Sequence, residues 1–491
     1  MIENVVVVGA GPTGLMLACE LCLGGVRPLV LERLPEPTGL SKALVLGGRA
    51  VDVLDHRGLL QRFKDCEPRT ATSFARLFHF GGLPIDVGRL EGEPPKFVFV
   101  LQAVTERLLA ERASELGVEV RRGHDLVSIR DDAEFVELTA QSEQGTRTFR
   151  SRFVVGCDGG RSSVRQLAEI SFPGLQPTRL LRLGDVKFGD PATRPAAWQD
   201  GRAPFPEIDD GYFRVITSEP LPPHLARDAP MTLDELRESV RRTTGTDVPI
   251  TEARWLSRFT DSSRQAERYR KGRVLLAGDA AHIQLPAGGP GLSTGLCDAV
   301  NLGWKLAAHI KGWAPADLLD TYHTERHAAG TRMLMHTRAQ GALLGGSGEQ
   351  TPALRELFGE LMQDPSTVRR LVDLLQGTDV CYTTDDDADA HPLAGRWAPE
   401  LTLQTARGRH RLADLMHDAR GVLLDFDDGA LCDQAVRWSD RIDVIRATCA
   451  SSPPARGLLV RPDGYVAWAG DHSAATPTRA LHRWFGAPDR E

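Results

Sequence analysis

The sequence of 491 residues predicts an α/β fold in which a nucleotide-binding domain is interrupted by an inserted β-sheet and followed by a small third domain. Three observations support this prediction. A glycine-rich turn separates an apolar strand from an apolar helix near the N-terminus, residues 175–260 are rich in proline and short strand-like pieces, and a polar stretch at 383–395 precedes further strand patterns. A chain of this length also exceeds what one hydrophobic core supports.

The first pattern is strand, turn, helix and strand within residues 5–32. Val5–Val8 is a continuous β-branched run, as in a strand buried on both faces. The turn GAGPTG, residues 9–14, follows directly, residues 15–23 have helical periodicity, and a strand at 28–31 ends at Glu32. A G-x-G-x-x-G turn in this position, followed by an acid, is typical of a Rossmann-like dinucleotide site. A glycine turn without a ligand is the less favoured alternative.

Two further pairs of glycine and acid follow strand patterns later in the chain. A helix is expected at 103–117, strands at 118–123 and 135–141, and an apolar strand at 153–156 that ends in Cys-Asp158-Gly-Gly. The sequence GRVLLAGDAAH, residues 272–282, predicts a strand ending at Asp279. Three such contact points suit a long ligand that is held at both ends.

The stretch LPAGGPGLSTG, residues 285–295, permits two interpretations. Its end matches the G-x-S-x-G of a hydrolase nucleophile elbow, with Ser293 as the nucleophile. That elbow needs an apolar strand directly before the serine, and the prolines and glycines of residues 285–290 cannot form a central strand. A loop that brings backbone N–H groups and a helix N-terminus to a cofactor is therefore favoured.

Helices are expected at 297–310, 317–343 and 352–376, and the third domain has strand patterns at 421–428, 441–447 and 457–470. The last reads as a hairpin with Asp463-Gly464 in its turn. His323 and His327 have an i, i+4 spacing without the H-E-x-x-H motif, and the acidic run at 385–389 lacks the glycine and glutamate of a calcium loop. No metal site is predicted.

Composition and charge disfavour several classes of protein. A net charge of −7 gives no reason to expect nucleic acid or an anionic membrane as a partner, and no apolar stretch reaches the length of a membrane span. Glu3 and the early glycines do not fit a signal peptide. Cys19 and Cys22 share a helix face with apolar residues, which favours core packing over redox chemistry. We expect a cytoplasmic protein that is a monomer or homodimer.

Together, GAGPTG…ER, CDGGRSSVR and GDAAH…PAGGPG resemble the FAD-dependent aromatic hydroxylases, which are single-component flavoprotein monooxygenases, over essentially the whole chain. GGLPIDVGRLEG, DAVNLGWKL and YHTERHAAG are most similar to hydroxylases of bacterial aromatic polyketide (angucycline-type) pathways and to rifampicin monooxygenase. The resemblance implies an FAD-binding domain of residues 1–174 and 270–382 and a substrate-binding β-sheet domain of 175–269, to which 75–100 contribute. It also implies a thioredoxin-like domain at 393–491, structural because it lacks a C-x-x-C.

The resemblance further implies the roles of single residues. The glycine turn would hold the pyrophosphate, Glu32 the adenosine ribose, Asp279 a ribityl hydroxyl, and the loop to Ser293 the pyrimidine end of the flavin. Pro286 would be the catalytic contact, through its backbone near the flavin hydroperoxide. The full set of expected cofactor contacts is Gly9, Gly11, Pro12, Thr13, Gly14, Glu32, Arg33, Lys42, Gln102, Leu126, Asp158, Gly278, Asp279, Pro286, Gly289, Gly291, Leu292 and Ser293.

Three departures from the family pattern lie in this region. Where relatives read G-G-Q-G-x-N, this chain has Pro290 and Ser293, Cys297 stands in place of a glutamine, and Lys42 in place of an arginine over the flavin. FAD binding is expected to survive these changes, whereas flavin mobility and hydroxylation are the properties they put in question.

By resemblance, NADPH or NADH reduces FAD, O₂ adds to form a flavin hydroperoxide, and one oxygen atom is inserted into an aromatic substrate, in antibiotic or other secondary-metabolite biosynthesis. A broad cavity for a polycyclic phenol is expected, with a floor formed by the apolar segments 180–186, 212–217, 254–259 and 97–102. Baeyer–Villiger oxidation, antibiotic inactivation, and a dehydrating or reductive step without hydroxylation are the alternatives.

Overall fold

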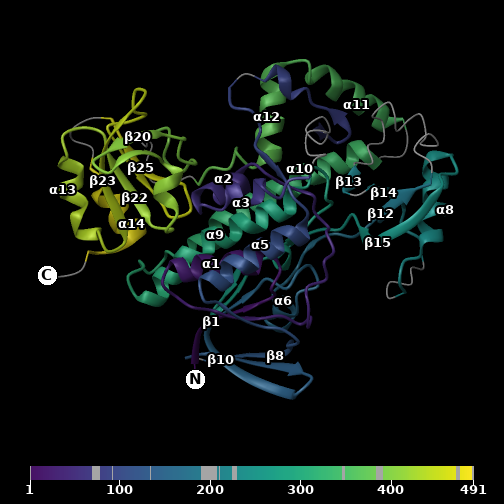
Figure 1. Ribbon diagram of the computed structural model, residues 1–491, viewed down its shortest axis with the longest axis horizontal. Helices are drawn as coiled ribbons and strands as arrows, with labels where there is room; N and C mark the ends of the chain where they lie inside the picture. Colours follow the sequence, from purple (N-terminus) through teal and green to yellow (C-terminus); the bar gives the residue numbers. More distant parts are fainter. Residues whose placement is uncertain are drawn as a thin grey trace.

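The computed structural model describes residues 2–68, 78–90, 92–132, 134–189, 207–209, 211–223, 229–345, 349–382, 391–471 and 476–488. Figure 1 shows a central α/β domain with a small β-sheet on one side and the C-terminal domain on the other. The acidic run at 385–389 falls outside the described residues.

The central sheet has the order β17-β18-β10-β1-β2-β7. Its strands are β1 (Ile2–Val8), β2 (Leu29–Leu31), β7 (Glu119–Arg121), β10 (Gly145–Gly156), β17 (Arg270–Lys271) and β18 (Val274–Leu276). The strands from β18 to β7 are parallel, and Val8, Leu31, Gly156 and Leu276 stand in one register. The turns after these residues therefore gather at the carboxyl edge of the sheet, where open α/β sheets bind ligands. β8 (Asp125–Asp131) and β9 (Val136–Ser142) continue from β10 as an antiparallel hairpin.

Helices cover this sheet, with α1 (Pro12–Leu23) packed against both α5 (Gln102–Glu115) and α9 (Pro290–Lys311). The apolar spacing of α1 predicted one buried face, whereas in the structure nearly all residues from Pro12 to Leu21 are buried. Burial raises the pKa of the Cys19 and Cys22 thiols, which fits core packing and opposes thiolate chemistry. Shorter helices are α2 (Arg49–His56), α3 (Leu60–Lys64) and α6 (Ser163–Leu167).

After α10 (Thr321–Gly345), the single helix expected at 352–376 is wrong, since two helices lie there: α11 (Gln350–Leu361) and α12 (Pro365–Gln376). Asp364 ends the first and caps the second, because its carboxylate accepts the Thr367 N–H at 2.9 Å. Pro365 then occupies the first turn of α12, a position that proline favours.

The inserted sheet has the order β13-β14-β12-β15. Its strands are β12 (Arg179–Phe188), β13 (Glu207–Asp209), β14 (Tyr212–Pro220) and β15 (Ile250–Thr260), and α8 (Leu233–Thr244) covers one face. Val186, Val215, Leu236 and Val240 form the core between sheet and helix. Helix α8 was not predicted, although Thr232 followed three residues later by Glu235 has the spacing of a capping box. In the structure the Thr232 hydroxyl accepts the Glu235 N–H.

The described part of residues 75–100, for which a contribution to the substrate domain stays a prediction, forms two short strand pairs. β4 (His79–Phe80) pairs with β5 (Leu83–Pro84), and this hairpin packs against α10 and α12 in one cluster that includes Phe80 and Leu375. β6 (Phe97–Phe99) pairs with β3 (Val45–Gly47). A third small sheet joins β11 (Gly174–Leu175), β16 (Ser263–Gln265) and β19 (His282–Ile283). Short 3₁₀ turns lie at Val87–Arg89, Gly278–Ala280, Ala413–Met416 and Val436–Trp438.

The C-terminal domain contains a six-stranded sheet of order β21-β20-β23-β22-β24-β25. Its elements are β20 (Thr402–Thr405), β21 (Gly408–Arg411), β22 (Gly421–Asp425), β23 (Ile442–Cys449), β24 (Gly457–Val460) and β25 (Val466–Gly470), with α13 (Ala430–Ala435) and α14 (Thr478–Phe485). The expected strands and the hairpin are confirmed, and Gly464 has the positive φ of +86° that this turn needs.

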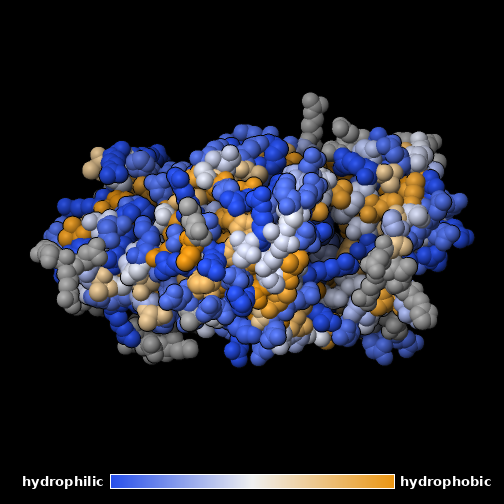
Figure 2. All heavy atoms as spheres, turned by 90° about the horizontal axis from the view of Figure 1, so that it is seen from below, coloured by the Kyte–Doolittle hydropathy of each residue, from blue (hydrophilic) through white to orange (hydrophobic). Residues whose placement is uncertain are grey.

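The face in Figure 2 is mostly hydrophilic, with hydrophobic residues in patches of limited size. Within the described ranges, the helices are too short or too polar to cross a membrane.

Candidate functional site

The glycine turn at residues 9–14 combines two close contacts with one open position. A Cβ atom at Gly9 would lie 2.5 Å from the carbonyl oxygen of Cys157, and one at Gly14 would lie 2.0 Å from the carbonyl oxygen of Gly9. A Cβ at Gly11 would meet no heavy atom within 4 Å. The turn is therefore packed on its sheet side and open in front of the α1 N-terminus, as a pyrophosphate cradle requires.

Glu32 holds this turn in place from the end of β2. One carboxylate oxygen accepts the Ala10 N–H and the other accepts the Leu34 N–H, each at 2.8 Å. The side chain is half-buried, so its remaining lone pairs can still reach a ribose hydroxyl. Arg33 follows as an exposed residue.

Asp158 is engaged by its own turn. Its carboxylate accepts the Ser162 hydroxyl at 2.5 Å and the Val164 N–H at 3.1 Å. Burial raises the pKa of Asp158, against the effect of these hydrogen bonds. Arg165 then donates to the carbonyl oxygens of Gly160 and Ala280, at 2.9 and 2.8 Å. Asp158 thus stabilises a turn that is tied to the strand end carrying Asp279.

Asp279 lies where the glycine turn, the end of β18 and helix α9 converge. A Cβ at Gly278 would lie 2.7 Å from the Thr13 hydroxyl oxygen, and one at Gly295 would lie 2.6 Å from the same atom. Asp279 is exposed, yet surrounding protein raises the pKa of its carboxyl, while His282 and Lys42 act in the opposite direction. Asp279 is thus a carboxylate that solvent reaches although protein surrounds it, which suits a ligand-binding acid.

The N-terminus of α9 faces the same region. Gly289 has a φ of +67° and precedes Pro290, the first residue of the helix. Ser293 lies inside the helix rather than at a strand end, and its hydroxyl accepts the Gly47 N–H at 3.2 Å. The structure therefore excludes the nucleophile elbow. The Pro286 carbonyl accepts the Gly289 N–H at 3.0 Å and so shapes the loop before the helix.

The segment before β3 lies beside this helix terminus. Gln102, the first residue of α5, accepts the Ala43 N–H at 3.3 Å through its side-chain oxygen. Lys42 is exposed. On its other side, the buried Arg214 of β14 donates to the carbonyl oxygens of Ser41 and Lys42, at 2.5 and 2.8 Å, and pairs with Asp185 of β12 at 2.8 Å. The inserted sheet is thereby attached to the segment that carries Lys42.

The register of the parallel strands thus brings the glycine turn, Glu32, Asp158 and Asp279 to the carboxyl edge of the sheet. Leu126 differs, because it is a buried residue of β8 paired with Ala140 in the core. Its contact with a cofactor stays a prediction, as do the individual roles of the other residues.

A buried acid that supports this edge of the sheet was not predicted from the sequence. Asp298 of α9 accepts the Gly278 N–H at 3.1 Å, His282 Nε2 at 2.7 Å and Arg326 Nε at 2.7 Å. Burial favours its neutral form, but Arg326 and His282 hold the pKa of Asp298 below its usual value. Asp298 and Arg326 lie in the motifs DAVNLGWKL and YHTERHAAG, which carried the resemblance without an assigned role.

The donors present fit FAD. The open glycine turn and Glu32 match its diphosphate and ribose, the accessible Asp279 matches a hydroxylated chain, and the α9 N-terminus matches a flavin ring that gains negative charge on reduction. Within the ranges that the structure describes, no group of three His, Cys, Asp or Glu side chains could hold a metal ion. Fold and site define a dinucleotide-binding flavoprotein.

Comparison with known proteins gives the family. Residues 3–337 match the family described as FAD binding domain, and residues 391–488 match aromatic-ring hydroxylase, C-terminal. The chain belongs to this family of FAD-dependent aromatic monooxygenases, and its mixed α/β fold is the fold of that family.

Similar proteins cover the full chain. The 12-dehydrotetracycline 5-monooxygenase/anhydrotetracycline 6-monooxygenase of Streptomyces rimosus is 44% identical, and the rifampicin monooxygenase of Streptomyces venezuelae is also 44% identical, each over 99% of both chains. The structure of OxyS anhydrotetracycline hydroxylase from Streptomyces rimosus has a TM-score of 0.89 at 42% identity over 100% of both chains. That of the Diels-Alderase PyrE3 has a TM-score of 0.83 at 36% identity over 99% of both.

Proposed function

We propose that this monooxygenase inserts one oxygen atom from O₂ into a polycyclic aromatic substrate of polyketide type, with NAD(P)H as the reductant, in secondary metabolism. The observation that carries the substrate class is the apolar face of the inserted sheet on the side of Lys42. The similar tetracycline and rifampicin enzymes support the same class.

Strand register separates the two faces of that sheet. Gly184 and Val215 are paired and face α8, since a Cβ at Gly184 would meet Leu236 at 2.4 Å. The neighbouring pairs face the other way, as strands alternate. This second face carries Leu181, Leu183, Ile216, Trp255 and Phe259 around the Asp185–Arg214 pair.

Ile216 is 43% exposed. Together with the half-buried Trp255 and Phe259, it offers a broad apolar wall and few charges. Such a wall suits the flat face of several fused rings.

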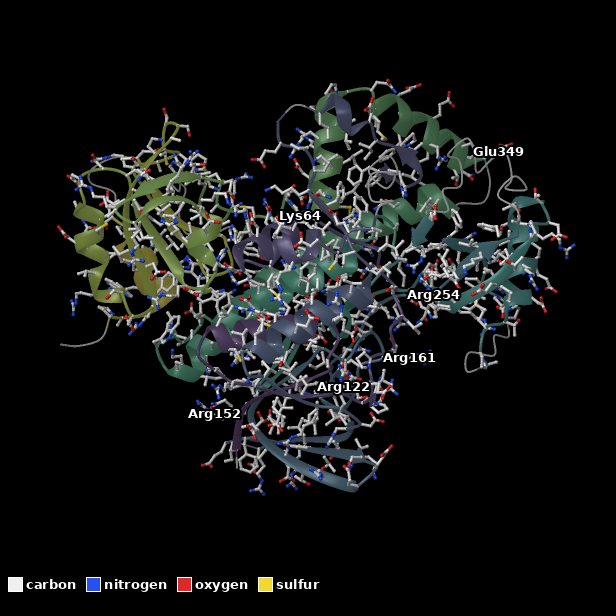
Figure 3. All side chains as sticks on the ribbon, in the orientation of Figure 1. Lys64, Arg122, Arg152, Arg161, Arg254 and Glu349 are labelled. Carbon is white, nitrogen blue, oxygen red and sulfur yellow. The ribbon has the colours of Figure 1, made fainter. Side chains whose placement is uncertain are left out.

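FAD, when bound, supplies the redox chemistry: it takes a hydride from NAD(P)H and activates O₂. We propose that Asp279 and the glycine turn bind the cofactor, that the α9 N-terminus stabilises negative charge on its pyrimidine side, and that the backbone at Pro286 contacts the oxygen-transfer region. Exposed Arg161, which Figure 3 shows on the side of the central domain toward the inserted sheet, would attract the phosphates of NAD(P)H.

The test is a panel of phenols. We expect a polycyclic phenol to stimulate NADPH oxidation with one oxygenated product formed per NADPH, and 4-hydroxybenzoate and phenol to do neither. Ile216→Asp should raise KM for the polycyclic phenol at least tenfold, whereas Val127→Asp, at an apolar side chain that is 50% exposed on β8, should leave KM unchanged. Efficient turnover of 4-hydroxybenzoate with no turnover of polycyclic phenols would refute the substrate class.

A second candidate is a flavoprotein that catalyses a step without oxygen insertion. The likeness to the Diels-Alderase PyrE3 supports it, and so do Lys42, Pro290 and Ser293, which alter the flavin-side segments relative to the family pattern. A product isomeric with its substrate, formed without NADPH, would identify this case.

We also propose that the C-terminal domain is thioredoxin-like and structural. Its parallel pair β22–β23 next to the antiparallel pair β24–β25 supports that topology. Cys432 and Cys449, its two cysteines, are free and far apart in sequence, so the domain offers no C-x-x-C.

A further inference from the structure

Buried charges connect the C-terminal domain with helix α9. Arg461, in the turn after β24, is 1% exposed and pairs with Glu325 of α10 at 2.6 Å. Glu325 also accepts Lys305 Nζ at 2.6 Å and the Asn301 side-chain amide at 2.7 Å, both from α9. Asp463 pairs with Arg461 as well, so the four charged groups balance.

Arg326, the next residue of α10, extends this series of buried ion pairs toward the segments expected to bind the flavin. Arg326 Nε donates to Asp298 at 2.7 Å, and its terminal nitrogen donates to the carbonyl oxygen of Thr294 at 3.3 Å. Thr294 is in the first turns of α9, next to Ser293. Asp298 in turn accepts the N–H of Gly278, the neighbour of Asp279. Arg326 and Asp298 therefore fix both flavin-side segments with respect to each other.

Tyr382, which precedes the C-terminal domain in the sequence, connects Arg326 with Tyr465 of that domain. Its hydroxyl accepts Arg326 Nη1 at 2.9 Å, and its ring lies 4.1 Å from that of Tyr465, centroid to centroid. Tyr465, Arg326, Ser293, Thr294 and Cys297 line one cavity of about 50 Å³. The first turns of α9 and the C-terminal domain therefore border the same small hollow.

We propose that Tyr382, Arg326 and Asp298, supported by the Glu325–Arg461 pair, are positioning residues through which the C-terminal domain holds the α9 N-terminus and Asp279 at the flavin. Dipoles stabilise charge best when they are fixed before it develops. Buried ion pairs contribute little net stability but can fix one geometry, because removing one partner leaves a buried charge unpaired. This assigns a role to a domain that has no redox pair of its own.

Tyr382→Phe tests the proposal on the holoenzyme, because it removes one hydrogen bond to Arg326 and keeps the ring against Tyr465. We expect flavin release at a fixed temperature to become three- to tenfold faster, and the midpoint potential of the bound flavin to become more negative. Glu325→Gln should shift both quantities in the same direction. KM for the aromatic substrate should stay unchanged, because neither residue borders the apolar wall of the inserted sheet.

Trp438→Phe is the matched control. It removes the hydrogen bond from the indole N–H to the carbonyl oxygen of Gly486 in the C-terminal domain and leaves the hydrogen bonds of Arg461, Glu325 and Arg326 in place. We expect it to lower the unfolding temperature without changing flavin release or potential. Wild-type flavin release and potential in both Tyr382→Phe and Glu325→Gln would overturn the proposal. An equal change in Trp438→Phe would also overturn it, since general loosening of the domain would then suffice.

Discussion

Substitution of Gly11 by alanine separates cofactor binding from folding. The backbone of Gly11, with φ −76° and ψ 178°, is extended and open to any L-residue. A Cβ there would meet no heavy atom of the protein within 4 Å. Gly11→Ala should therefore change the stability of the apoprotein by less than about 1 kcal/mol. The same methyl group would project into the pyrophosphate cradle, so FAD affinity should fall at least tenfold, about 1.4 kcal/mol.

The assay pairs urea unfolding of the apoprotein with a fluorescence titration of FAD. Gly14→Ala is the contrasting variant, because its Cβ would lie 2.0 Å from the Gly9 carbonyl oxygen, and such overpacking should destabilise even the apoprotein by about 3 kcal/mol. If Gly11→Ala binds FAD as tightly as the wild type, the turn is not the pyrophosphate site.

Three other variants test separate parts of the account. Asp279→Ala should release flavin on gel filtration while Cys19→Ala, in the core of α1, keeps it; equal retention in both would remove Asp279 from the site. Ser293→Ala should lose activity by about tenfold or less, because loss of a true nucleophile reduces kcat by about a millionfold; a loss of that size would restore the hydrolase interpretation. Burial and nearby Arg57 lower the pKa of His56 to about 3. In the unfolded chain His56 has a pKa near 6.5, so it binds a proton at a higher pH than in the folded protein. The free energy of unfolding should therefore fall by about 1.4 kcal/mol per pH unit below pH 6.5. His56→Gln should flatten this slope in urea unfolding between pH 4 and 7, and an unchanged slope would contradict the assignment.

The strands and the glycine turn could be predicted because their signals are local. Val5–Val8 is apolar at every position, and the turn after it follows a spacing set by one ligand. Once Gly9, Asp158 and Asp279 each follow a parallel strand, the sheet brings them to one edge without further information. Helix α8 and the helix break at Pro365 also have local sequence signals, namely the Thr232-x-x-Glu235 spacing and Asp364-Pro365. Neither element was predicted from them.

The supporting charges could not be predicted in this way. Asp298 and Arg326 are 28 residues apart, and Glu325 and Arg461 are 136 residues apart. A charged residue in a helix is most often exposed to solvent, and the residues next to it in the sequence do not indicate a partner in another domain. The same holds for Arg214 and Asp185, whose contact with the Lys42 segment depends on how the inserted sheet docks.

Turnover under ¹⁸O₂ shows directly whether the protein transfers an oxygen atom from O₂ to its substrate. With the holoenzyme, NADPH and a polycyclic phenol, the account predicts a product that contains one ¹⁸O atom and forms in proportion to the NADPH consumed. A product without ¹⁸O, or NADPH consumption that yields only hydrogen peroxide with every polycyclic phenol, would contradict it.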